Sequence, residues 1–192
     1  MRLICAAVAL VVSMTGSDIE RALAIARARD TERQQFHSRY VFAVNDPAVT
    51  QIEVITDFRR LVTIAEDHVL RGDSMFTRGV RAAEQALAPT RGTVTIRAQV
   101  RLNPLNTFID TPDYGLGIGN PSGAFTPVNA QLTPQYSVPF KTRQGKTVTS
   151  LIGATLESNL PSEGIGQTTR AVFVTLDGKE VTRLTVDFGR LD

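Results

Sequence analysis

The residues that could bind a metal ion or transfer protons are few in this chain. It contains two histidines and one cysteine, too few for a zinc site built from His and Cys side chains. Glu66, Asp67 and His68 are consecutive, but neighbouring residues of a helix point about 100° apart, so their side chains do not converge. A metal site needs three or four converging ligands. We therefore expect neither a bound metal nor a cofactor.

Ser74 has a sequence context that could support nucleophilic catalysis. The tripeptide Gly72-Asp73-Ser74 resembles the nucleophile block of GDSL-type esterases. Those enzymes need a histidine that follows the serine, whereas His37 and His68 both precede it. Without that base the hydroxyl is a weak nucleophile, and a role as a helix N-cap explains Ser74 better.

Two glycine-containing segments match nucleotide-binding loops only in part. Gly145-Lys146-Thr147 copies the end of a P-loop, but Phe140 occupies the position of its first glycine, and a strand is expected to follow. The glycines at 115, 117 and 119 lack the spacing of a dinucleotide-binding turn. Neither segment predicts a nucleotide site.

Three carboxylates in predicted loops, Asp110, Asp113 and Glu163, leave a secreted hydrolase open as an alternative. Two carboxylates are enough for glycosidic hydrolysis. Their spacing does not single out a pair, however. We therefore assign no catalytic residue and favour a protein that is not an enzyme.

The main candidate for a binding region is a span of 27 residues without a charged side chain, between Asp113 and Lys141. Its four prolines predict a long connection with short edge strands, because proline within sheets is confined to edges and loops. Long loops of compact domains also carry many binding sites. We therefore take the aromatic residues of this span as candidate ligand-binding residues: Tyr114, Phe125, Tyr136 and Phe140.

Three segments in the first half of the chain are expected to be helical. Residues 22–39 contain no glycine or proline and many strong helix formers. Residues 57–71 and 75–88 repeat apolar side chains at spacings of three and four, and would form a helical hairpin. The β-branched run Val62-Thr63-Ile64 leaves a β-hairpin as the alternative for 57–71.

Strand patterns dominate after Gly92. Apolar and polar residues alternate from Val94 to Leu102, as in a strand with one buried face. Residues 171–176 and 181–188 flank Asp177-Gly178, a dipeptide favoured in type I′ hairpin turns. Further strands are expected at 40–44, 51–55, 114–118 and 148–156.

Helices early and strands late predict an α+β fold. We expect the N-terminal helices to pack on a C-terminal antiparallel β-sheet or β-sandwich formed by residues 92–190, with a sandwich favoured over a barrel. The length of 192 residues and the 42% hydrophobic content suit a single compact domain over 25–192. Its part 25–91 would be mainly helical and its part 92–192 mainly β.

Residues 1–24 are expected to be a signal peptide. Arg2 precedes an apolar run, residues 3–12, that is too short to cross a bilayer. Two candidate cleavage sites follow, Ala22-Leu23-Ala24 and Ala24-Ile25-Ala26. We expect export to the periplasm or the extracellular space, with no transmembrane span in the mature chain. The alternative is an N-terminal helix, because Ser17-Asp18-Ile19-Glu20 fits a capping box.

The charge is nearly balanced, with 21 basic and 19 acidic residues, and no nucleic-acid partner is expected because acidic side chains interleave with the N-terminal arginines. With the catalytic motifs rejected, we expect an exported, non-catalytic binding or cell-envelope accessory protein whose partner is an envelope protein or a glycan. The alternatives are the hydrolase above and a chaperone-like assembly factor that offers an exposed strand edge.

Overall fold

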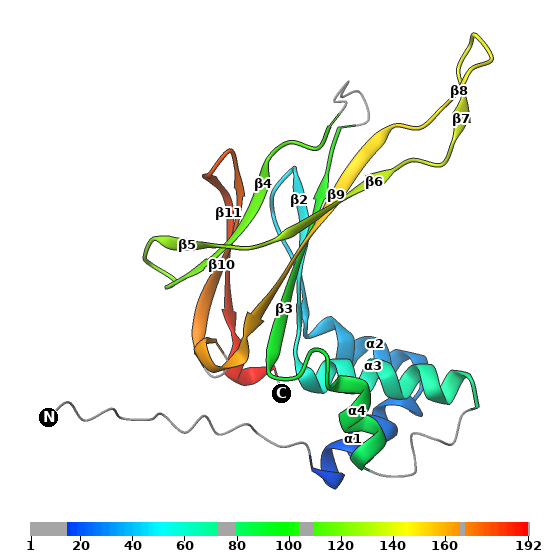
Figure 1. Cartoon of the computed structure of the whole chain (residues 1–192), viewed down its shortest axis with the longest axis vertical. Helices are drawn as coiled ribbons and strands as arrows, with labels where there is room; N and C mark the ends of the chain where they lie inside the picture. The colour runs from blue at the N-terminus through cyan, green and yellow to red at the C-terminus, as the bar shows by residue number, and fades with distance from the viewer. Residues whose placement is uncertain (1–14, 73–79, 104–109, 166–167, 192) are drawn as a thin grey trace, which may run out of the picture.

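Two antiparallel sheets form a sandwich, and a helical unit lies at one end of it (Figure 1). The structure is a computed structural model that describes residues 15–72, 80–103, 110–165 and 168–191. The apolar run at 3–12 and Ser74 lie outside these ranges. The predicted α+β fold, with N-terminal helices packed on antiparallel sheets, is confirmed. Within the described ranges, no helix has the length and apolar content needed to cross a membrane.

The first two helices correct one expectation. The single helix predicted over 22–39 is wrong: the chain forms α1 (Gly16–Ala26) and α2 (Asp30–Ser38) instead. Arg29 breaks the helix because its backbone is extended, with φ −63° and ψ 153°. A capping box formed by Thr15 and Asp18 starts α1, earlier than the sequence predicts.

The other two helices agree with the sequence where they are described. α3 (Asp57–Leu70) confirms the helix predicted at 57–71, and the β-hairpin alternative is wrong. Thr56, rather than Asp57, caps it, because the Thr56 side chain accepts the backbone N–H of Arg59. α4 (Val80–Leu87) lies within the predicted segment 75–88, of which residues 75–79 are outside the described ranges.

The first sheet has five strands in the order β1-β2-β3-β9-β6, and the second has four in the order β11-β10-β4-β5. A separate hairpin pairs β7 with β8. The strands expected from the sequence are present with ends shifted by a few residues, except that the segment predicted as one strand over 148–156 is divided between β8 and β9. The bounds are β1 Val41–Ala43, β2 Val49–Ile55, β3 Thr93–Arg101, β4 Tyr114–Gly119, β5 Phe125–Val128, β6 Gln131–Tyr136, β7 Phe140–Lys141, β8 Thr147–Val148, β9 Leu151–Pro161, β10 Thr169–Leu176 and β11 Lys179–Asp187, with short 3₁₀ helices at Ser162–Gly164 and Phe188–Arg190.

The main hydrophobic core fills the space between the two sheets. β3 buries Val94, Ile96 and Val100 on its inner face, which confirms the alternation read from the sequence. Val172 and Val174 of β10 meet them from the second sheet. The odd-numbered residues of β3 therefore face outward.

The helices have a hydrophobic core of their own. Phe36 of α2 packs against both this core and the core of the sandwich. A chain cut after Ala24 would lose two of the buried side chains that α1 contributes. The helical core consists of Ile19, Ala22, Ala26, Leu61, Val62, Ala65, Ala83 and Leu87.

Two arginines at the start of α3 join the helical unit to the first sheet. The buried Arg59 donates to the carbonyl oxygen of Val54 at 2.7 Å and pairs with Glu53 at 2.5 Å. Arg60 donates to the carbonyl oxygen of Thr93 at 2.7 Å. Buried charges are tolerated when they are paired and hydrogen-bonded. The two guanidinium groups therefore tie α3 to β2 and β3.

The C-terminal hairpin has the predicted turn. Asp177 and Gly178 both have positive φ, 50° and 72°, as a type I′ turn requires. Leu176 and Lys179 are the last cross-strand pair before the turn. The Asp-Gly dipeptide therefore sets the register next to the turn, and a β-bulge between Val174 and Thr175 shifts the register farther along β10 and β11.

The register of β3 makes a testable prediction about stability. Val100→Asp should lower the free energy of unfolding by several kcal/mol, because Val100 is buried and a lone buried carboxylate is costly. Arg101→Asp, at the exposed neighbouring position, should change it by about 0.5 kcal/mol or less. Urea denaturation compares the two variants, and equal losses would show that the register is wrong.

Candidate functional site

The four aromatic residues predicted to bind a ligand do not gather at one place. Tyr114 belongs to the core between the sheets. Burial raises the pKa of its hydroxyl, and the carboxylates of Asp46 and Asp177 add to this effect. Tyr114 is thus a packing residue in this structure.

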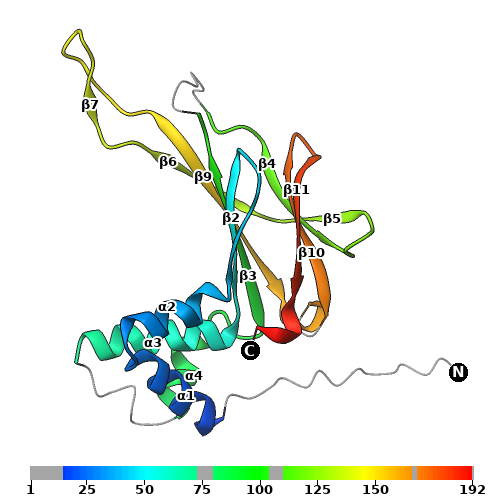
Figure 2. The ribbon, with the colours of Figure 1, turned by 180° about the vertical axis from the view of Figure 1, so that it is seen from behind.

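Phe125 is separated from the two remaining aromatic residues. It lies half-buried on the edge strand β5, with its ring centroid 5.1 Å from that of Phe173. Tyr136 and Phe140 lie instead on a projection that we call the arm, residues 136–152. Here the chain leaves β6, forms the β7–β8 hairpin and returns into β9, beyond the end of the sandwich that lies opposite the helices (Figures 1 and 2).

The arm is an ordered two-stranded hairpin. Near its base, the N–H of Ser137 donates to the carbonyl oxygen of Ser150 at 2.8 Å, and the N–H of Ser150 donates to the Ser137 hydroxyl at 3.0 Å. At its tip, the N–H of Thr142 donates to the carbonyl oxygen of Lys146 at 2.9 Å. These bonds hold the side chains of the arm away from the body of the protein.

Within the described ranges, most of the large apolar side chains that are exposed to solvent lie on the arm. Val138 is 83% exposed, Tyr136 56%, Phe140 48% and Ile152 38%. The remaining one is Leu70, 75% exposed at the end of α3. Clustered exposed apolar residues mark interaction surfaces, whereas single ones are common on any protein.

The tip of the arm is basic. Lys141, Arg143 and Lys146 are exposed, and residues 114–156 include no acidic side chain. Within the described part of the chain, these three side chains form no ion pair. The arm therefore combines apolar contact area with uncompensated positive charge.

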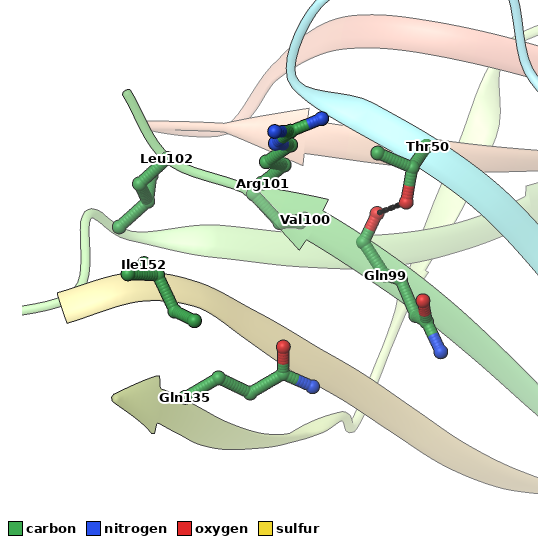
Figure 3. A pocket seen from close by; sticks show the side chains of 7 residues that line it. All are labelled: Thr50, Gln99, Val100, Arg101, Leu102, Gln135 and Ile152. Carbon is green, nitrogen blue, oxygen red and sulfur yellow. Dashed lines mark hydrogen bonds between the residues drawn. The ribbon is translucent and has the colours of Figure 1, made fainter. Parts of the chain in front are cut away.

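Two hollows lie beside the base of the arm, on the outer face of the first sheet. The first has a volume of about 320 Å³, and the second, of about 460 Å³, shares Gln99 with it. In the first, the hydroxyl of Thr50 donates to the carbonyl oxygen of Gln99 at 3.3 Å (Figure 3). The first is lined by Thr50, Gln99, Val100, Arg101, Leu102, Gln135 and Ile152, and the second by Arg97, Gln99, Gln131, Thr133, Thr155 and Glu157.

The first hollow presents more apolar than polar surface, whereas the second presents mainly amide, hydroxyl and charged groups. Arg97 donates to Glu157 at 2.9 Å and to Glu53 at 3.1 Å across three strands. Partial burial works to lower the pKa of Arg97, but the two carboxylates outweigh it and raise the pKa. The lining suits hydrogen bonding and offers no nucleophile activated by a base.

Asp113 and Glu163, two of the carboxylates considered for a hydrolase, are not brought together. Asp113 lies beside the β10–β11 turn, because its carbonyl oxygen accepts the N–H of Asp177 at 3.0 Å. Glu163 lies in the connection between β9 and β10, so the eight-residue length of β10 separates it from Asp113. Asp110 is exposed three residues before Asp113.

His37 and Glu66 form a further pair between two helices. Nε2 of His37 lies 3.0 Å from Oε1 of Glu66, joining α2 to α3. In the ranges the structure describes, no cluster of three or more His, Cys, Asp or Glu side chains could hold a metal ion. The pair is explained by helix packing.

Sequence reasoning found part of the arm and missed the rest. Tyr136 and Phe140 were predicted as binding residues, whereas Val138 and the basic tip were not. A usable signal was present, because the basic residues at 141, 143 and 146 continue a stretch without any acidic residue up to Glu157. The sequence pattern alone does not indicate that this stretch leaves the sheet.

Comparisons with known proteins do not assign a function. No family model matches the chain, and no curated protein matches it. The chain is similar to a crystal structure of a protein of unknown function from Burkholderia pseudomallei K96243, with 12% sequence identity and a TM-score of 0.43, over 93% of this chain and 95% of that chain. A likeness at this level carries no argument about function.

Gly153, at the base of the arm, makes a second prediction about stability. A Cβ at this position would overlap the carbonyl oxygen of Val100 on β3. We expect Gly153→Ala to lower the free energy of unfolding by about 1–3 kcal/mol, measured by urea denaturation. Gly123→Ala is the control, because the nearest atom to a Cβ there, Cβ of Asn120, lies at 3.4 Å, an ordinary contact distance. Similar stabilities of both variants would contradict the close approach at Gly153.

Proposed function

We propose that this chain is an exported, non-catalytic binding protein of the cell envelope that engages its partner through the arm. The observation that carries the proposal is the exposure of Val138, Tyr136 and Phe140 on one projecting hairpin. Leaving a large apolar side chain in water, rather than burying it, forgoes about 1.5–3 kcal/mol. A partner that covers the arm recovers this free energy.

Three of the four sheet edges favour contact through side chains over strand addition, which is the binding mode of the chaperone-like alternative. Pro127 and Pro134 lie on the edge strands β5 and β6, as the sequence predicts for prolines of the uncharged span. Proline has no N–H to offer to an added strand. A third edge strand, β1, has only three residues. These three edges are poor templates for a chain that pairs along them, whereas the fourth, β11, has nine residues and no proline and leaves strand addition open there.

The positions of the carboxylates support the alternative function, a hydrolase, less well than the proposed binding function. A glycosidase needs two carboxyl groups on either side of one bond, within about 10 Å of each other. Glu163 is separated from Asp113 by the length of β10. The lining of the two hollows on the first sheet includes one carboxylate, Glu157, which is already paired with Arg97 at 2.9 Å.

Export is the second part of the proposal, and it rests on the apolar run at residues 3–12. The cleavage site at Ala24 lies inside α1, which buries Ile19 and Ala22 in the helical core. A mature chain that begins after Ala24 must fold without both side chains. The intact mass of the exported protein locates the cut.

The export signal can be tested with a reporter enzyme that is active only outside the cytoplasm, fused to the C-terminus of the chain. The wild-type fusion should be active. Val8→Lys should abolish activity because a charge interrupts the apolar run, whereas Val8→Leu should preserve it. Equal reporter activity with Val8→Lys and with wild type would contradict export by this segment.

The contact made by the arm can be tested without knowing the partner. Val138→Cys and Leu70→Cys, each combined with Cys5→Ser to remove the single native cysteine, place a thiol at two exposed positions. The purified proteins should react with a maleimide at similar rates. In the envelope fraction of the native cells, Val138→Cys should react about tenfold more slowly if the partner is present at about ten times its Kd.

Leu70→Cys is the matched control, since it lies on α3, away from the arm (Figure 1). Its rate should be the same in the purified protein and in the envelope fraction. Unchanged labelling of Val138→Cys in that fraction would show that the arm is free, and the proposed function would be wrong.

A further inference from the structure

The positive charge of this protein is concentrated on the arm. The whole chain has 21 basic and 19 acidic residues, for a net charge of +2. Lys141, Arg143 and Lys146 are the charged residues between 114 and 156, and without them 18 basic residues face 19 acidic ones, a net charge of −1. The rest of the chain is therefore close to neutral in sum, whereas every charged side chain of the arm is basic.

Elsewhere, many basic side chains are neutralised locally. Arg59 pairs with Glu53, Arg97 with Glu157, and Arg183 with Glu180, all at 2.9 Å or less. The three basic side chains of the arm face solvent instead, without an ion pair in the described ranges. Unpaired charges that lie together on a projection attract an anionic partner.

We propose that the arm binds the surface of an anionic phospholipid bilayer. Val138 and Phe140 enter the interfacial region, while the basic tip lies against the headgroups. This inference rests on the proposed function and names its partner. Apolar side chains next to Lys and Arg are the combination that binds such surfaces, through burial of apolar area and attraction to anionic lipids.

The shape of the molecule agrees with a flat partner. The arm extends past the strands of both sheets, at the end of the sandwich away from the helices, in both views (Figures 1 and 2). A planar surface can therefore meet the arm before it meets the body. The tyrosine at 136, more than half exposed, suits the boundary between headgroups and acyl chains.

The side chains favour a bilayer over a nucleic acid. Binding of single-stranded nucleic acid relies on aromatic side chains that stack on bases. The most exposed apolar residue of the arm, Val138, is aliphatic and cannot stack. An interfacial lipid layer accepts aliphatic and aromatic side chains alike.

The test is sedimentation of the purified chain with vesicles. Vesicles of equal parts phosphatidylcholine and phosphatidylglycerol should bind it, and vesicles of phosphatidylcholine alone should not. Each basic residue near an anionic surface strengthens binding about fivefold, so Lys141→Gln, Arg143→Gln and Lys146→Gln combined should weaken it about 100-fold. Added salt should also weaken vesicle binding by the wild-type chain, because salt screens the attraction between the basic residues and the anionic headgroups.

Matched controls separate the arm from overall charge and overall hydrophobicity. Arg27→Gln, Arg29→Gln and Arg39→Gln combined remove the same charge from exposed positions of the helical unit and should leave binding unchanged. An equal loss with this control would overturn the inference.

Two further variants test how much the apolar side chains of the arm contribute to vesicle binding. Phe140→Ser combined with Val138→Ser should weaken vesicle binding, because both side chains enter the interface. Leu70→Ser, at an exposed apolar position on α3, should not weaken it. Unchanged binding by the variant with both arm substitutions would overturn the inference.

Two outcomes distinguish this inference from the proposed function. If the chain ignores anionic vesicles, or binds a single-stranded oligonucleotide more tightly than it binds them, the bilayer is the wrong partner. The protection of Val138→Cys in the envelope fraction then still supports a binding arm. If Val138→Cys is unprotected there as well, both proposals fail.

Discussion

The antiparallel ladder between β3 and β9 is the interaction on which the rest of the structure depends. It runs from the pair Thr93 and Pro161 to the pair Arg101 and Gly153. On one side β3 binds β2, and on the other side β9 binds β6. A two-stranded hairpin is at best marginally stable in water by itself. One side of the arm continues into β9, which belongs to this ladder, and the other side continues from β6, which pairs with β9, so the first sheet holds both sides of the arm at its base.

The path of the chain also keeps the helices and the arm at opposite ends of the sandwich. The helices α3 and α4 are inserted between β2 and β3, so they lie where β3 begins. The arm is inserted between β6 and β9, and β9 starts where β3 ends because the two strands are antiparallel. Arg59 and Phe36 then hold the helical unit against the first sheet. The arm is thus presented on the face of the molecule that the helices leave free.

The sequence predicted the fold where a local pattern decides the structure. The alternation along β3, the period of α3 and the Asp177-Gly178 turn each reflect nearest-neighbour rules, and all three are confirmed. The break between α1 and α2 was missed because Arg27, Ala28 and Arg29 are good helix formers. There the packing of Ile19 on one core and Phe36 on two cores overrides propensity.

The candidate site was harder to predict because an uncharged segment has no single structural meaning. Within one such segment Tyr114 packs between the sheets, Phe125 packs on Phe173, and Tyr136 points into solvent. What separates them is whether another strand covers the position, which depends on long-range pairing. Beyond Tyr136 the chain leaves the first sheet for the arm, and Val138 and Phe140 are exposed there. The basic tip fits this position, since like charges on two arms repel a second copy while an anionic surface is attracted.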